Sequence, residues 1–230
     1  MKILVLNPNS DEGMAAKIQA SARRFAGDRF QVDCLCAPGG PAFLETYLDI
    51  QRSAAGMMQL FQENQENYDG FLVACGYDPN LDLLKELTNK PVVGTAEASM
   101  KMATMLGHRF SMLCTDVHSI PIKEDLALHY GVERQVASVR VAQLPHCSGE
   151  EDDIPPELVD AYVDACRCAA KEDGAEVVVL SCAGFAGLDR LLTQRVGFPV
   201  LDGVTCGLIL LEGMVRSGIS ISKARRFQGS

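Results

Sequence analysis

The chain has 230 residues, of which 47% are hydrophobic and 22% charged, a composition typical of a folded globular protein. Its net charge of -9 argues against nucleic-acid binding, because phosphates require clusters of Lys and Arg. No apolar run approaches the roughly 20 residues of a membrane span, and the apolar start at 1–7 is too short for a signal peptide. We therefore expect a cytoplasmic protein with neither nucleic acid nor a membrane as partner.

Apolar strands and amphipathic helices alternate along the first part of the chain. A strand at 2–6 is followed by Ser10 and Asp11, either of which can cap a helix that runs to about Phe25. Further strands are expected at 30–36, 71–75 and 91–94, and further helices over 45–65, 81–87 and 95–106.

The same alternation begins again at Gly107. Strands are expected at 109–114, 136–141, 176–181 and 199–201, and helices over 119–130, 155–171, 187–195 and 203–215. The acidic segment 148–153 is interpreted as a solvated loop. Strands that alternate with helices throughout indicate an α/β fold with parallel sheets.

Most of the nine cysteines are expected to be small buried hydrophobic residues, as free cysteines usually are. A disulfide framework is not expected in a chain of this length without a signal peptide. Cys34 and Cys36, like Cys166 and Cys168, lack the Cys-x₂-Cys spacing of zinc sites, so no metal site is predicted.

The strand that ends at Cys75 has a counterpart later in the chain. Residues 71–82 match residues 178–189 at an offset of 107, which pairs Cys75 with Cys182. In both copies a buried strand stops at the cysteine and a helix follows shortly after it. A thiol at this place in an α/β protein lies where such folds bind their ligands.

The same offset places Asn9 on Asp116, so the repeat extends to the front of each copy. We predict two pseudo-symmetric, flavodoxin-like parallel-sheet halves: residues 1–96 plus 205–230, which carry Cys75, and 97–204, which carry Cys182. If the halves face each other about a pseudo-twofold axis, the two thiols approach one cleft from opposite sides.

Two facing thiols suit the inversion of a stereocentre. One group removes a proton from one face while the other delivers a proton to the opposite face, and the two exchange roles in the reverse direction. Cysteine, with an ordinary pKa of about 8.5 that falls at helix N-termini, can serve in both roles near neutral pH. Backbone N–H groups at 76–78 and 183–185 could stabilise charge that develops on a neighbouring carbonyl.

The residues resemble the aspartate/glutamate/hydantoin racemase superfamily, and most closely its hydantoin and allantoin racemases. The matching motifs follow one another in order over nearly the whole chain: Ile3 to Ser10, Gly40-Pro41 leading to Glu45 and Tyr47, Ala74-Cys75 with Asp78-Pro79, Pro91 to Gly94 with Ala96-Glu97-Ala98, Arg109-Phe110-Ser111, Cys182-Ala183-Gly184, and Pro199 to Gly203. Each is a weak signal alone, and together they are specific.

The resemblance implies a racemase that transfers a proton between Cys75 and Cys182 without a cofactor, and it makes a homo-oligomer plausible. It also implies a set of substrate contacts on the loops around both cysteines: Asn9, Ser10, Gly76, Tyr77, Thr115, Ala183 and Gly184. Gly76-Tyr77 departs from the family's Phe-Gly or similar pair, which leaves the substrate's side chain open. Ala183-Gly184 lacks the polar side chains of acidic amino-acid racemases, so a cyclic ureide is favoured.

Other interpretations stay open at this stage. The chain could be an amino-acid racemase, decarboxylase or cis–trans isomerase of the same superfamily, or a non-catalytic small-molecule-binding module. Glu97 could favour its helix N-terminus or anchor the cleft, and His118 could lie on the surface or line the site. His146-Cys147 is not assigned as a nucleophilic pair, because adjacent residues rarely face each other.

Overall fold

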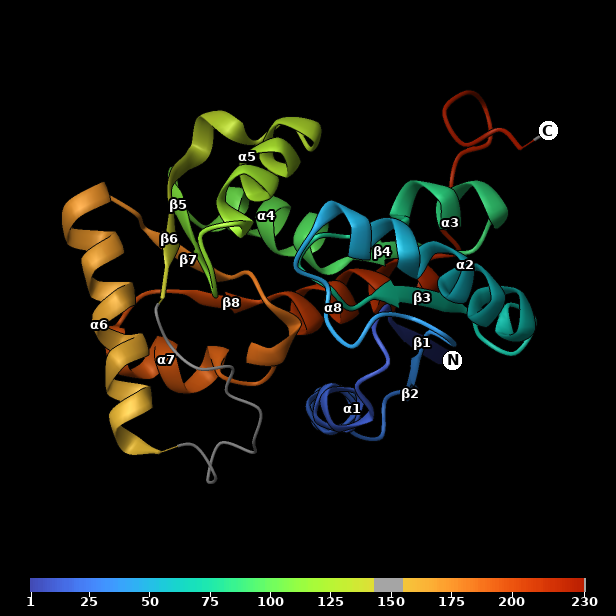
Figure 1. Cartoon of the computed structure of the whole chain (residues 1–230), viewed down its shortest axis with the longest axis horizontal. Helices are drawn as coiled ribbons and strands as arrows, with labels where there is room; N and C mark the ends of the chain where they lie inside the picture. Colours follow the sequence, from blue (N-terminus) through green and yellow to red (C-terminus); the bar gives the residue numbers. More distant parts are fainter. Residues whose placement is uncertain (143–154, 230) are drawn as a thin grey trace.

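A computed structural model describes residues 1–142 and 155–229, and it contains two four-stranded parallel sheets (Figure 1). The strand order β2-β1-β3-β4 of the first sheet is repeated as β6-β5-β7-β8 in the second. The strands are β1 (Lys2–Asn7), β2 (Gln31–Cys36), β3 (Gly70–Val73), β4 (Val92–Gly94), β5 (Phe110–Cys114), β6 (Val136–Val141), β7 (Val177–Leu180) and β8 (Val200–Asp202). The predicted α/β fold with two parallel-sheet halves is confirmed.

Helices connect the strands of each sheet, and their bounds differ from the expected ones by a few residues. They are α1 (Glu12–Ala26), α2 (Tyr47–Asn64), α3 (Leu81–Leu87), α4 (Thr95–Leu106), α5 (Ser119–His129), α6 (Pro156–Asp173), α7 (Asp189–Val196) and α8 (Gly203–Arg216). Asp11, one of the two expected caps, accepts the N–H of Met14 at 3.0 Å and so begins α1. Thr46 begins α2 through a reciprocal capping box with Asp49.

The inner strands are buried on both faces, which explains why they read as continuous apolar runs. Every residue of β3 and of β7 is buried, and so is every residue of β1 beyond Lys2. β3 and β7 also correspond residue for residue at the offset of 107. The repeat detected in the sequence is therefore a repeat of these inner strands.

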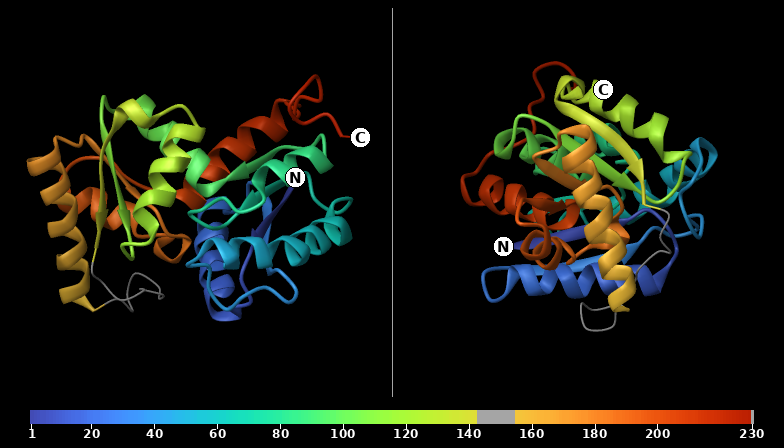
Figure 2. Two further views of the ribbon diagram at one scale, coloured as in Figure 1. Left: turned by 45° about the horizontal axis from the view of Figure 1, so that its top comes forward. Right: turned by 90° about the vertical axis from the view of Figure 1, so that its left-hand side faces the viewer.

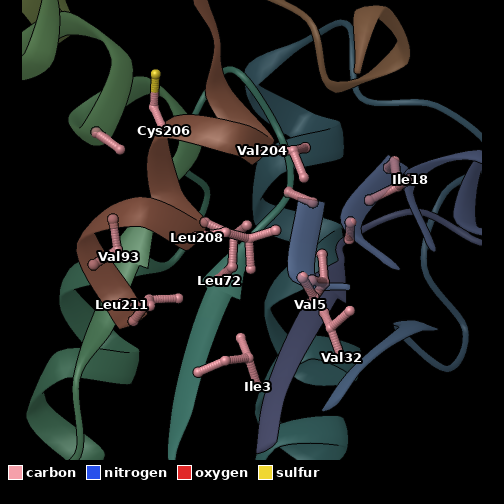
Figure 3. Packing of buried hydrophobic residues seen from close by; sticks show 14 of the residues in the cluster. Ile3, Val5, Ile18, Val32, Leu72, Val93, Val204, Cys206, Leu208 and Leu211 are labelled. Carbon is pink, nitrogen blue, oxygen red and sulfur yellow. The ribbon is translucent and has the colours of Figure 1, made fainter. Parts of the chain in front are cut away.

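The two halves exchange their last helices (Figure 2). Leu208 and Leu211 of α8, which follows the second sheet, pack with Ile3, Val5 and Leu72 of the first sheet (Figure 3). Conversely α4, which follows the first sheet, contributes to the core beneath β5 and β7. This exchange supports the division at 96/97 and 204/205, which remains our proposal.

The N-termini of α4 and α8 meet where the halves join. A Cβ atom on Gly203, the first residue of α8, would lie 2.6 Å from the Cβ of Thr95, the first residue of α4. Only glycine permits this separation, so the close approach of the two helices depends on Gly203.

Asp78 fixes the loop after Cys75 to both neighbouring helices. This carboxylate is buried and accepts the N–H groups of Ala96 at 3.0 Å and Glu97 at 2.7 Å, at the start of α4. It also accepts the hydroxyl of Tyr130, which follows α5, at 2.6 Å. Burial raises the pKa of Asp78 to about 6, while these hydrogen bonds favour the ionised form. In the sequence, Asp78 reads as an ordinary turn residue.

Two sequence features, the acidic segment 148–153 and the pair His146-Cys147, lie outside the described residues. Within the described ranges, no helix is long and apolar enough to cross a membrane.

Replacement of Asp78 by Ala should destabilise the protein by about 2–3 kcal/mol. The change leaves two helix N–H groups and one hydroxyl without their acceptor, at about 1–3 kcal/mol for each buried orphan, partly offset by the loss of a buried charge. Urea denaturation of Asp78→Ala against Asp164→Ala, an exposed position on α6, measures the difference. The Asp164 variant should stay within about 0.5 kcal/mol of the parent; equal stabilities would contradict the assigned role of Asp78.

Candidate active site

Cys75 and Cys182 occupy equivalent places in the two halves. Each lies two residues beyond the end of an inner strand, Cys75 after β3 and Cys182 after β7. Both line one cleft, which has an empty volume of about 610 Å³ including its open mouth, and both are partly buried there.

The two cysteine-bearing loops touch each other. A Cβ atom on Gly76 would lie 1.9 Å from the carbonyl oxygen of Ser181, the residue before Cys182. No side chain fits between them, so a glycine directly after Cys75 is a condition for bringing the two thiols to one cleft.

Each thiol accepts a backbone N–H from the residue two positions further along. The N–H of Tyr77 bonds to Cys75, and the N–H of Gly184 bonds to Cys182. The two thiols therefore accept equivalent backbone hydrogen bonds.

Burial dominates the ionisation of both thiols. It raises the pKa of Cys75 to about 12 and also raises the pKa of Cys182. The two N–H bonds and the positive charge of Lys123 act in the opposite direction. Burial therefore favours the protonated form of both thiols.

Lys123 of α5 lies beneath the cleft and is 1% exposed. Its ammonium donates to the carbonyl of Gly76 and to that of Ser181, the latter at 2.9 Å. Nζ also lies 4.7 Å from the ring centroid of Tyr77. No feature of the sequence indicates this residue, because a single lysine in a predicted helix carries no pattern.

Most of the residues predicted to contact a substrate line the cleft: Asn9, Gly76, Tyr77, Thr115 and Ala183. Gly184 adjoins the cleft through its N–H to Cys182. Ser10 is exposed and hydrogen-bonds to the Pro41 carbonyl, with no place among the cleft-lining residues.

Glu97 and His118, whose roles the sequence does not decide, are not among the cleft-lining residues. Glu97 pairs with Lys85 at 2.7 Å, and His118 is exposed just before α5.

Several cleft residues were not predicted: Met14, Phe43, Leu44, Glu45, Asp116 and Ser119. Residues 43–45 come from the loop before α2; Glu45 belongs to a motif of the resemblance, but no pattern in the sequence places this loop at the site. Asp116 did have one, since the 107-residue offset places it opposite Asn9.

Asn9 lines the cleft, and hydrogen bonds hold its side-chain amide in place. Its oxygen accepts Nδ2 of Asn7 at 2.6 Å and the N–H of Asp11 at 3.0 Å, while its own Nδ2 contacts the sulfur of Met14 at 3.4 Å. With one N–H directed at Met14, the amide of Asn9 keeps a second N–H that can donate to a ligand.

Asp116 anchors a hydrogen-bonded chain in the cleft lining. It accepts the hydroxyls of Ser119 at 2.9 Å and Thr115 at 3.1 Å, and Ser119 is 2.7 Å from the hydroxyl of Tyr77. Although burial acts to raise it, these hydrogen bonds lower the pKa of Asp116. An ionised carboxylate therefore lines the cleft.

The cleft lining carries negative but no positive side chains. Among its described residues, Asp116 and Glu45 are acidic, and there is no Lys, Arg or His. The described part of the chain also contains no group of three His, Cys, Asp or Glu side chains placed to hold a metal ion. The lining suits a neutral ligand rich in N–H groups.

Comparisons with known proteins agree with this geometry. Residues 3–211 match a family model described as Asp/Glu/Hydantoin racemase. The hydantoin racemase of Pseudomonas sp. (strain NS671) is 34% identical, with 99% of this chain and 91% of that protein covered. The structures of allantoin racemase from Klebsiella pneumoniae and Pseudomonas fluorescens are 31% and 33% identical, each with a TM-score of 0.92 and with all of this chain covered. The alignments cover 94% and 97% of those two chains.

Replacement of Gly76 by Ala should destabilise the protein by about 2–3 kcal/mol, because the added methyl overlaps backbone atoms that must move apart. Gly213→Ala is the matched control, since a Cβ there meets open space on α8. That variant should gain up to about 1 kcal/mol from helix propensity. Thermal and urea unfolding measure both; equal effects at the two positions would show that the loops are not in contact.

Proposed function

The chain belongs to the Asp/Glu/hydantoin racemase family, and on that premise we propose that it racemises a 5-substituted hydantoin or allantoin. Cys75 and Cys182 act as the two acid/base groups in this proposal. The observation that carries it is the pair of matched thiols, one from each half, on loops that touch through Gly76 and Ser181.

The proposed reaction moves one proton off the stereocentre and another onto it. The thiolate of one cysteine takes the proton from C5 on its own face, and the thiol of the other delivers its proton to the opposite face. The first cysteine ends as a thiol and the second as a thiolate, so the reverse reaction starts from the product state. Proton transfer by a positioned side chain contributes about 10²–10⁴-fold in rate.

Negative charge that develops on the ring carbonyl beside C5 needs a donor. The oxygen of the Asn9 side chain already accepts two hydrogen bonds, and its N–H₂ group is a donor within a cleft-lining residue. We assign it to a ring carbonyl, together with backbone N–H groups beside the cysteines.

The charge of the lining favours a cyclic ureide over a free amino acid. An amino acid brings an α-carboxylate, for which the described lining residues offer no cationic side chain. A hydantoin ring or a ureido substituent instead offers N–H groups, which Asp116 and Glu45 can accept.

The cytoplasmic location and a homo-oligomeric state remain predictions from the sequence.

Racemisation in D₂O tests this function. Allantoin and a 5-alkylhydantoin should lose optical rotation while deuterium appears at C5, whereas aspartate and glutamate should be unaffected. Cys75→Ser and Cys182→Ser should each lower the rate by about 10²–10⁴-fold. Cys168→Ser, at a partly buried cysteine on α6, is the control and should match the parent.

Two outcomes would refute the proposal. One is normal racemisation by both single variants at the cleft. The other is racemisation of the amino acids alone.

The pH dependence of thiol reactivity gives a second test that needs no substrate. Because burial raises the pKa of both thiols, the thiolate fraction should keep increasing above the ordinary cysteine pKa of about 8.5. Iodoacetamide alkylation of Cys75 and Cys182, followed by peptide mass spectrometry, should accelerate about tenfold per pH unit from about pH 7 to about pH 9. A rate already level at about pH 7 would contradict the assigned pKa direction.

A further inference from the structure

Lys123 is a buried cation without a carboxylate partner in the described part of the chain. The structure has a second buried lysine, Lys85, and its ammonium is neutralised by Glu97 at 2.7 Å. No such ion pair forms at Lys123, whose ammonium donates to the carbonyls of Gly76 and Ser181. A buried charge that forms no ion pair is costly, and an anion that forms nearby would stabilise it.

The two carbonyls that hold Lys123 belong to the two cysteine loops. Gly76 directly follows Cys75, and Ser181 directly precedes Cys182. A single ammonium thus ties together the two loops that Gly76 and Ser181 bring into contact. Its position beneath both loops also places one positive charge within reach of both thiols.

We propose that Lys123 is the positioning residue of the site, which holds the two cysteine loops together and supplies the positive charge against which either thiol ionises. The inference rests on the proposed two-thiol function. A shared charge fits a racemase in particular, because the thiolate forms on Cys75 in one direction and on Cys182 in the other. A cation dedicated to one cysteine would favour one direction of proton transfer.

The charges around Lys123 are consistent with this role. The pKa of Lys123 is lowered, because desolvation outweighs the facing groups that raise it: Cys75, Cys182, Asp78 and Cys114. Reciprocally, Lys123 lowers the pKa of Cys75 and of Cys182 against the effect of their burial. Tyr77 also faces the ammonium, through its ring, and Asp116 acts to raise the pKa of Cys182.

Alkylation profiles of the two thiols against pH test the proposal without substrate. Lys123→Met removes charge and donors, Lys123→Gln removes charge but keeps an N–H donor, and Lys123→Arg keeps the charge. Lys90→Met is the matched control, because Nζ of Lys90 also donates to two backbone carbonyls, those of Gln65 and Tyr68, away from the cleft.

In the Met and Gln variants, alkylation of both Cys75 and Cys182 should slow by about tenfold or more at pH 8, the effect of a pKa raised by about one unit. Racemisation should fall in parallel, mainly in kcat. Lys123→Arg should retain more thiol reactivity than Lys123→Gln, and Lys90→Met should match the parent protein.

A purely structural lysine predicts the opposite sign. Loss of the two hydrogen bonds from Lys123 alone would separate the cysteine loops, expose the thiols and speed their alkylation. Unchanged or faster alkylation in a folded Lys123→Met or Lys123→Gln variant would overturn the proposal.

A reciprocal measurement keeps the proposal testable if neither variant folds. The titration of Lys123 in the parent is compared with that in Cys75→Ala/Cys182→Ala, by NMR of ¹³C-labelled lysine. Removal of both thiols should lower the pKa of Lys123, and an identical titration would refute the coupling. Failure of the parent to racemise any hydantoin would refute the proposed function alone, since these thiol and lysine titrations need no substrate.

Discussion

The contact between the two cysteine loops, one after β3 and the other after β7, is the constraint on which the rest of the structure depends. Gly76 lies so close to the carbonyl of Ser181 that no side chain fits between them. The exchanged helices α4 and α8 bring the halves together, and Asp78 fixes the Cys75 loop to the start of α4. Together these features set the distance between the end of β3 in the first sheet and the end of β7 in the second.

Burial has opposing effects on the proposed chemistry of such a site. It excludes water from a carbanion and strengthens every charge interaction, but it also raises the pKa of the thiols that must ionise. Two backbone N–H bonds and one buried ammonium offset this effect without placing a cationic side chain in the described cleft lining. The described cleft lining therefore has no cationic side chain that would attract the carboxylate of a ligand. Both thiols still have the positive charge of Lys123 beneath them.

The features that the sequence predicts are local or periodic. Buried parallel strands leave continuous apolar runs, and a duplicated strand leaves a constant offset, so these two patterns are enough to pair Cys75 with Cys182. Lys123 and Asp78 could not be found in this way. Their roles arise from contacts between elements distant in the chain, with Asp78 reaching α4 and Lys123 reaching both loops. For Ser10 the sequence suggests a helix cap, and the resemblance implies a substrate contact. In the structure Asp11 caps the helix and Ser10 is exposed.

The repeat also shows where symmetry is kept and where it is broken. The two thiols are equivalent, and the proposed inversion requires the same chemistry on both faces of the stereocentre. Asn9 and Asp116 are equivalent in position as well, on the loops after β1 and β5, but one presents an amide donor and the other a carboxylate acceptor. A fully symmetric lining would hold an asymmetric ring equally well in two orientations, and only one of the two would place C5 between the thiols. In the proposed reaction, different groups at these two positions would allow one orientation of the ring for both enantiomers, so that the ring stays in place while the proton changes faces.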